Sequence, residues 1–146
     1  MDPRDDLLKL DNQLCFALVT AARNVVAIYR PVLEPLGLTH PQYLVMLALW
    51  EQSPRSLRCL AEELAMEPAT LSPLVKRLEA QGMISRVRSA DDERRLDIGL
   101  TGEGRDLRSR ALDVPVQIMA RVGMDAAQIA QLRDGLAPFA GRRPDL

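Results

Sequence analysis

Aromatic residues are scarce in this chain of 146 residues, which has one tryptophan, two tyrosines and two phenylalanines. Because 47% of the residues are nonetheless apolar, the core must consist mainly of leucine, valine, alanine and methionine, a mixture that favours helices. The length suits one compact module with a real core and leaves little room for a second domain. We therefore expect a mainly α structure.

Cysteine and histidine are scarcer still. Cys15 and Cys59 are the only cysteines and His40 is the only histidine. Two cysteines make a disulfide framework implausible and favour a reducing compartment, and one histidine is too few for a zinc site built with two cysteines. The sequence contains no nucleophile elbow, phosphate loop or cofactor fingerprint. We expect no metal, no cofactor and no enzyme, with a thiol peroxidase that uses Cys15 and His40 as the enzymatic alternative.

Long hydrophobic runs are also missing. The longest nearly apolar stretch, residues 43–50, is too short to span a bilayer, and the charged N-terminus is unlike a signal peptide. These features predict a cytoplasmic protein with no membrane partner. The net charge of −1 does not by itself indicate a nucleic-acid binder. However, residues 68–88 carry four basic side chains against the single acid Glu79, so positive charge is concentrated there.

The first half of the chain has the apolar period of helices. Apolar residues recur every three or four positions from Leu10 to Val32, which predicts a long opening helix that Pro31 and Pro35 break or restart. Thr39 and Gln42 have the spacing of a capping box, so a second, buried helix is expected over residues 40–51.

Two shorter helices and a hairpin follow. Ser56 can cap a third helix, and a fourth is expected from Thr70 to Gly82 with Pro73 in its first turn. Apolar residues then alternate in residues 84–87 and 96–100, which predicts two strands joined by a charged hairpin.

Helices are expected again in the last third. Thr101 can cap one that is interrupted near Pro115, and Asp125 with Gln128 can open the last one. The tail from Gly141 is expected to fray.

A short helix, a tight turn, a second helix and a two-stranded hairpin are the elements of a winged helix-turn-helix, in that order. The outer face of the fourth helix contains small residues that allow close approach to a DNA groove and basic residues that neutralise phosphates. The hairpin supplies arginines shaped for a narrow minor groove. The alternative is an ordinary solvated basic face. The candidate DNA-binding residues are Ser72, Pro73, Lys76 and Arg77 on the helix and Arg86, Arg88, Arg94 and Arg95 in the hairpin.

Residues 60–82 and 86–101 resemble the reading helix and wing of the multiple-antibiotic-resistance-regulator (MarR) family, and the Asp92-x-Arg94 motif is the most recognisable part. The resemblance implies that Arg94 enters the minor groove and that Asp92 fixes the wing. It also implies a homodimer that binds double-stranded DNA at a palindromic operator. We accordingly divide the chain into an N-terminal dimerisation and sensor helix (1–36), the winged helix-turn-helix (37–101) and C-terminal dimerisation helices (102–146).

Residues 10–18, 29–33 and 38–44 resemble the organic-hydroperoxide-sensing branch of that family. The resemblance implies a repressor that is released when an organic hydroperoxide oxidises Cys15, with Tyr29 as a hydrogen-bond donor to its thiolate. His40 stands where the branch usually has a second tyrosine, and Val19 stands where it often has an aromatic residue. His40 can still donate a hydrogen bond or, if protonated, stabilise the thiolate.

Each of these residues also has a purely structural alternative assignment. Cys15 can be a small buried hydrophobe, as most free cysteines are, and His40 can be a surface residue at a helix start. In that case the repressor would respond to an aromatic acid or drug bound between the dimerisation helices and the DNA-binding heads. Cys59, in the predicted third helix, is expected to belong to the core.

Overall fold

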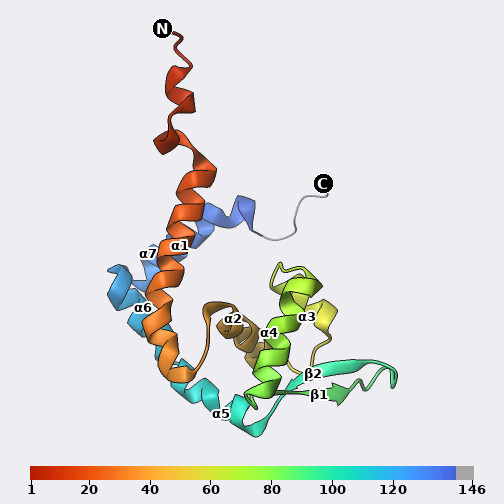
Figure 1. Ribbon diagram of the computed structural model, residues 1–146. Coiled ribbons are helices and arrows are strands. Elements are labelled where there is room, and N and C mark those ends of the chain that lie inside the picture. Colours follow the sequence, from red (N-terminus) through yellow and green to blue (C-terminus); the bar gives the residue numbers. More distant parts are fainter. Residues whose placement is uncertain (141–146) are drawn as a thin grey trace.

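The computed structural model describes residues 1–140, which are mainly helical with one two-stranded antiparallel sheet (Figure 1). This confirms the predicted fold class. The elements are α1 (Leu14–Leu33), α2 (His40–Glu51), α3 (Leu57–Glu63), α4 (Pro68–Ala80), β1 (Ile84–Arg88), β2 (Leu96–Leu100), α5 (Gly102–Ala111), α6 (Val114–Val122) and α7 (Ala126–Leu136), with short 3-10 turns at Asp5–Leu8, Leu10–Asn12, Glu34–Leu36 and Ala137–Phe139. The tail from Gly141 lies outside the described residues.

Helix α2 is the centre of the core. Val45, Met46 and Leu49 are buried, and the helix packs against α1, α3, α4, α5 and β2. Its predicted start is confirmed, because the Thr39 hydroxyl accepts a hydrogen bond from the Gln42 N–H at 3.3 Å and the Gln42 side chain accepts one from the Thr39 N–H at 3.0 Å. This reciprocal cap satisfies two N–H groups that the helix itself leaves unpaired.

Helices α3 and α4 form the helix-turn-helix. The predicted cap of α3 is confirmed, since the Ser56 hydroxyl accepts a hydrogen bond from the Cys59 N–H at 3.0 Å. Helix α4 begins at Pro68 and not at the predicted Thr70, because a proline at the first helical position has a suitable φ and needs no hydrogen-bond donor there. Pro73 therefore lies in the second turn, not in the first, on an exposed side where water can reach the carbonyl that loses its partner.

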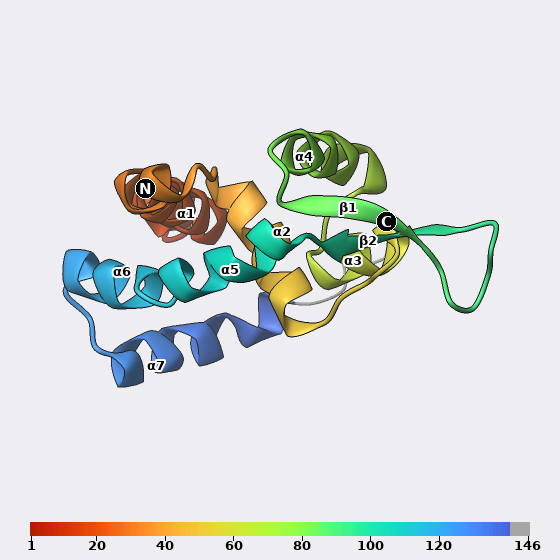
Figure 2. The ribbon, with the colours of Figure 1, turned by 90° about the horizontal axis from the view of Figure 1, so that it is seen from below.

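The two predicted strands are confirmed and form a wing. Ile84 pairs with Leu100 and Arg88 with Leu96, and the buried Ile84 and Ile98 anchor the sheet to the core. The connecting loop, residues 89–95, projects away from all the helices (Figure 2). Gly82, with a φ of +78°, provides the left-handed residue that separates α4 from this wing.

The opening helix differs from its prediction at both ends. It begins at Leu14, after two 3-10 turns, and not at Leu10. It also continues through Pro31 to Leu33, although Pro31 was expected to break it. Because Pro31 is in the last turn, its missing N–H removes one hydrogen bond and leaves the preceding turns intact.

The C-terminal helices α5 and α7 begin at the predicted caps. The Thr101 hydroxyl accepts a hydrogen bond from the Gly104 N–H at 3.0 Å, and Asp125 and Gln128 form the predicted capping box of α7. The predicted interruption near Pro115 separates α5 from α6, but α6 itself was not predicted. Pro115 occupies the first turn of α6, so it begins a helix as well as ending the previous one.

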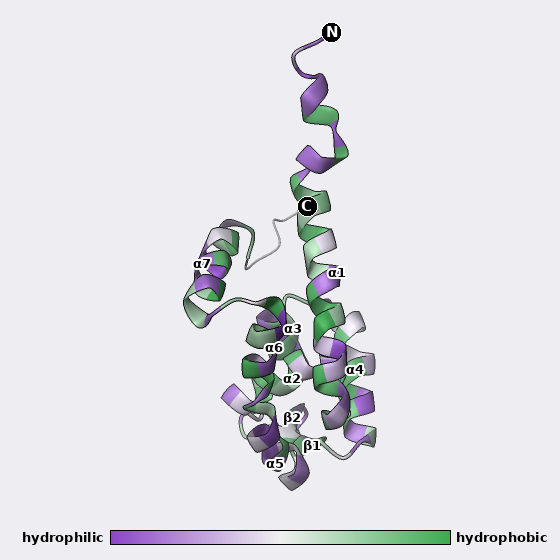
Figure 3. Ribbon diagram, turned by 90° about the vertical axis from the view of Figure 1, so that its left-hand side faces the viewer, coloured by the Kyte–Doolittle hydropathy of each residue, from purple (hydrophilic) through white to green (hydrophobic). Residues whose placement is uncertain are grey.

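Helices α1 and α7 expose much of their apolar surface. Figure 3 shows α1 rising clear of the body and α7 standing to one side of it. By length and composition alone, one helical segment, Leu14–Leu36, could cross a membrane, with a mean hydropathy of 1.3 and 11% of the window buried. The sequence reading missed this because Arg23 and Arg30 interrupt the run without lowering its average much. Exposed apolar helices of this kind indicate a protein partner.

Candidate functional sites

The outward face of α4 is the first candidate site. Leu71, Val75 and Leu78 are fully buried and so fix the rotation of the helix about its axis. The opposite face is thereby presented to solvent, with Pro73, Lys76 and Arg77 exposed and Ser72 half-buried. The exposure is as predicted for a reading helix, and the DNA contacts of these residues stay a prediction.

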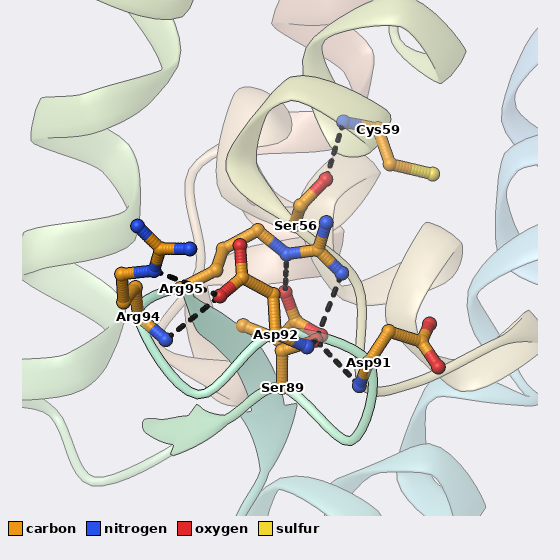
Figure 4. Close-up of polar contacts among 8 residues, drawn as sticks. Ser56, Cys59, Ser89, Asp91, Asp92, Arg94 and Arg95 are labelled. Atoms are coloured by element: carbon orange, nitrogen blue, oxygen red, sulfur yellow. Dashed lines mark hydrogen bonds and ion pairs between the residues drawn. The ribbon is translucent and has the colours of Figure 1, made fainter.

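The wing presents Arg94 to solvent. Its side chain is 97% exposed. Asp92 holds this residue, because one oxygen of its carboxylate accepts a hydrogen bond from the Arg94 N–H at 3.0 Å and lies 3.8 Å from the Arg94 Nε (Figure 4). The arrangement fits the roles predicted for both residues, a positioned arginine and the aspartate that positions it.

The other three wing arginines have partners within the protein. Arg88 donates a hydrogen bond to the Glu93 carbonyl at 3.1 Å, and the half-buried Arg86 has its Nε 3.9 Å from the Glu79 carboxylate. Arg95 donates to Asp97 at 3.0 Å and to the Ser89 hydroxyl at 2.9 Å. The sequence predicted all four as DNA contacts, but their surroundings differ.

The second candidate site is an aromatic pair at the junction of α1 and α2. The rings of Tyr29 and His40 meet edge to face with centroids 4.9 Å apart, and Tyr43 lies 5.9 Å from Tyr29. Burial raises the pKa of Tyr29 and lowers the pKa of His40. At neutral pH the tyrosine keeps its proton and the imidazole is neutral, so the predicted electrostatic role of a protonated His40 is disfavoured.

Cys15 is exposed in the first turn of α1 and is not near this pair within its own chain. Cys15 and Tyr29 lie on the same helix, and 14 residues correspond to about 21 Å at 1.5 Å per residue. Cys15 therefore does not meet Tyr29 and His40 within one chain, and their predicted grouping stays a prediction about the dimer. Tyr43 was missed by the sequence reading, although its position three residues after His40 on a predicted helix places it on the same face.

Cys59 is exposed, which corrects its predicted place in the core. The short helix α3 buries Leu60 and Ala61. Because Cys59 immediately precedes them, it lies on the solvent side of the same turn. Within residues 1–140 no group of three or more histidine, cysteine, aspartate or glutamate residues could hold a metal ion.

A cavity of about 520 Å³ lies between α2, α3, α5 and α6. Its lining is mainly apolar and includes Tyr43, Leu47, Trp50, Leu64 and Leu112, with Glu63 and Arg108 among the polar residues. The cavity borders both the helix-turn-helix and the C-terminal helices, which is the place expected for a ligand that acts on DNA binding.

Comparisons with known proteins agree with this architecture. The family model of SarA/Rot transcriptional regulators matches residues 27–110. The organic hydroperoxide resistance transcriptional regulator of Bacillus subtilis (strain 168) is 39% identical over 136 residues, which cover 93% of this chain and 92% of that protein. The chain belongs to the MarR family of winged-helix transcriptional regulators.

Solved structures of MarR-family regulators resemble the chain over most of its length. Reduced AbfR bound to DNA, from Staphylococcus epidermidis, is 35% identical with a TM-score of 0.68 and covers 76% of this chain and 78% of its own. CouR from Rhodococcus jostii RHA1, bound to p-coumaroyl-CoA, is 27% identical with a TM-score of 0.77 and covers 95% and 99%. MarR-family proteins are dimeric DNA-binding transcriptional regulators, not enzymes.

Proposed function

We propose that this MarR-family chain is a homodimeric repressor that an organic hydroperoxide releases from its operator by oxidising Cys15. The observation that carries the proposal is the placement of Cys15 in the first turn of the exposed apolar helix α1 and of the Tyr29–His40 pair near its other end, where α1 meets α2. The similarity to the Bacillus subtilis hydroperoxide regulator supports the choice of oxidant.

Two copies of α1 packed antiparallel would complete the site. In a two-fold symmetric interface every contact between different residues occurs twice. If residue i of one chain contacts residue j of the other, then residue j of the first chain contacts residue i of the second. Cys15 of each copy would therefore meet Tyr29 and His40 of the other, and the dimer would have two equivalent sites. The exposed apolar surface of α1 supports such packing.

The oxidation needs few groups. The Cys15 thiolate attacks one oxygen of the hydroperoxide, the O–O bond breaks, and the other oxygen leaves as an alkoxide that takes up a proton. Cysteine is oxidised to a sulfenic acid while the hydroperoxide is reduced to an alcohol. Tyr29 keeps its proton at neutral pH, since an ordinary tyrosine pKa is about 10 and burial raises the pKa of Tyr29 further, so it can donate a hydrogen bond to the sulfur or the alkoxide.

The site is joined to the reading helix through the start of α2. Gln42, which is buried, takes part in the cap at Thr39 and donates a hydrogen bond to the Gln81 side chain at 3.5 Å. Gln81 follows α4 directly and donates to the Gly37 carbonyl at 3.2 Å. A shift at His40 would therefore move the C-terminal end of α4. The position of α4 in each chain determines how the two DNA-binding regions of the dimer fit the DNA.

The remaining parts of the proposal follow from this mechanism. The regulator works in the cytoplasm, where its DNA is. Residues 1–36 and the C-terminal helices α5, α6 and α7 form the dimer, and residues 37–101 bind DNA. Each oxidation converts the Cys15 thiolate to a sulfenic acid, so without an added reductant Cys15 should consume about one equivalent of hydroperoxide and then stop.

The apolar cavity favours a second candidate, a repressor of the same fold released by a small aromatic ligand. Its volume of about 520 Å³ and its mainly apolar lining suit a small organic molecule. The similar protein CouR was solved with p-coumaroyl-CoA. In that candidate Cys15 has no role in release.

Release from DNA by cumene hydroperoxide tests the two candidates. An operator duplex is first selected from random double-stranded DNA with the reduced wild-type protein, and binding is followed by fluorescence anisotropy. We expect cumene hydroperoxide to release the wild type and Cys59→Ser but not Cys15→Ser, because a serine hydroxyl cannot form a sulfenic acid. Release of Cys15→Ser as readily as the wild type would reject the redox mechanism and favour the ligand.

A further inference from the structure

We propose that Arg95 is a positioning residue of the wing, which holds the loop so that Arg94 reaches DNA but makes no DNA contact itself. The proposal rests on the proposed DNA-binding function. From its positive charge alone, Arg95 would be expected to contact a DNA phosphate. The contacts of its guanidinium indicate otherwise (Figure 4).

The first contact anchors Arg95 to the sheet. Its Nε donates to a carboxylate oxygen of Asp97 at 3.0 Å, and Asp97 is only 7% exposed. A buried carboxylate that loses its cationic partner is strongly unfavourable. Arg95 is thus held toward Asp97, and a DNA phosphate would have to compete with that carboxylate for it.

The second contact joins Arg95 to the wing loop. Its Nη2 donates to the hydroxyl of Ser89, which is 5% exposed, at 2.9 Å. The same oxygen accepts the N–H groups of Asp91 at 3.2 Å and Asp92 at 3.4 Å. The Ser89 N–H in turn donates to the Arg95 carbonyl at 2.9 Å and closes the loop. The guanidinium thereby links strand β2 to the first residue of the loop, and the backbone hydrogen bond joins that residue to the last one.

The last contact connects the ordered loop to Arg94. Asp92, whose N–H is held by Ser89, accepts the Arg94 N–H on its carboxylate at 3.0 Å. The contacts run without a break from the buried Asp97 through Arg95, Ser89 and Asp92 to the exposed Arg94. An ordered loop presents its arginine at a smaller entropic cost on binding than a mobile one does.

The affinity for the selected operator duplex distinguishes a positioning residue from a residue that contacts DNA. We expect Arg95→Ala and Asp97→Ala each to weaken binding about tenfold and the double variant to be no weaker than either, because both remove the same link. The double variant keeps the net charge and should keep the salt slope, whereas Arg94→Ala should lower the slope by about one. If Asp97→Ala binds as well as or better than the wild type, and Arg95→Ala loses slope as Arg94→Ala does, then Arg95 contacts DNA and the proposal fails.

Backbone dynamics test the same proposal without DNA. In the free dimer, ¹⁵N relaxation should show the amides of residues 91–94 becoming more mobile in Arg95→Ala, with order parameters falling below about 0.6, while the amides of α2 are unchanged. Arg95→Lys, which keeps the charge but not both contacts, should be intermediate. Unchanged order in Arg95→Ala would overturn the positioning role. A wild type that selects no duplex would instead reject the proposed function, and the relaxation result would still decide the role of Arg95.

Discussion

At the scale of single residues, Arg95 donates a hydrogen bond to the buried Asp97 carboxylate at 3.0 Å, whereas Cys15 is exposed in the first turn of α1. Cys15, Tyr29 and His40 were identified by resemblance, yet the count of residues along α1 separates Cys15 from Tyr29 by about 21 Å. Arg95 was assigned to DNA by its charge. Asp97 follows Arg95 by two residues at the start of β2, and residues two apart in an extended chain lie on the same side, which could have revealed the pair. A partner that is buried by tertiary packing is not visible in charge patterns.

Tyr29 allows a residue-scale prediction about reactivity. Tyr29→Phe keeps the ring but removes the donor, so oxidation of Cys15 by cumene hydroperoxide should slow about tenfold, which corresponds to the loss of one hydrogen bond of about 1.4 kcal/mol. The rate is measured by trapping the sulfenic acid with dimedone and mass spectrometry. Tyr43→Phe is the matched control, because Tyr43 contacts the same ring, and it should react like the wild type. Equal rates for Tyr29→Phe and the wild type would remove Tyr29 from the mechanism.

At the scale of elements, helix starts were predicted well where a cap defines them. The Thr39 and Asp125 caps depend on side chains three residues apart and so can be recognised locally. Proline was the main source of error, because the same residue type begins α4 at Pro68, lies in the first turn of α6 at Pro115, and is tolerated in the last turn of α1 at Pro31. Which of these applies depends on neighbouring turns and not on the proline.

The α2 cap gives a prediction about stability. Thr39→Ala removes the oxygen that accepts the Gln42 N–H, which should lower the free energy of unfolding by about 1 kcal/mol. The change is measured by urea unfolding at one protein concentration, since dimer stability depends on concentration. Thr70→Ala is the control, because Thr70 is exposed within α4 and caps no helix. A loss of equal size in the control would show that the cap contributes nothing specific.

At the scale of the whole molecule, the chain is incomplete without a second copy. Large apolar side chains are exposed on α1, α6 and α7, including Phe16, Val116 and Leu132, far from the reading helix and wing. The resemblance to the MarR family implied a homodimer, and the family is dimeric. The register of the two chains could not be predicted, because it depends on surfaces formed only after folding.

Charge placed on these surfaces should separate the chains. We expect Phe16→Glu combined with Leu132→Glu to give a monomer in sedimentation at micromolar concentration, because burying two unpaired carboxylates opposes association. Two linked heads gain affinity from binding both half-sites of an operator, so the monomer should bind the selected duplex at least about a hundredfold more weakly. Leu96→Glu is the control, since this exposed apolar residue lies on the wing, and it should leave the dimer intact. A double variant that remains dimeric would place the interface elsewhere, and a monomer that kept full affinity would show that one head alone reads the operator.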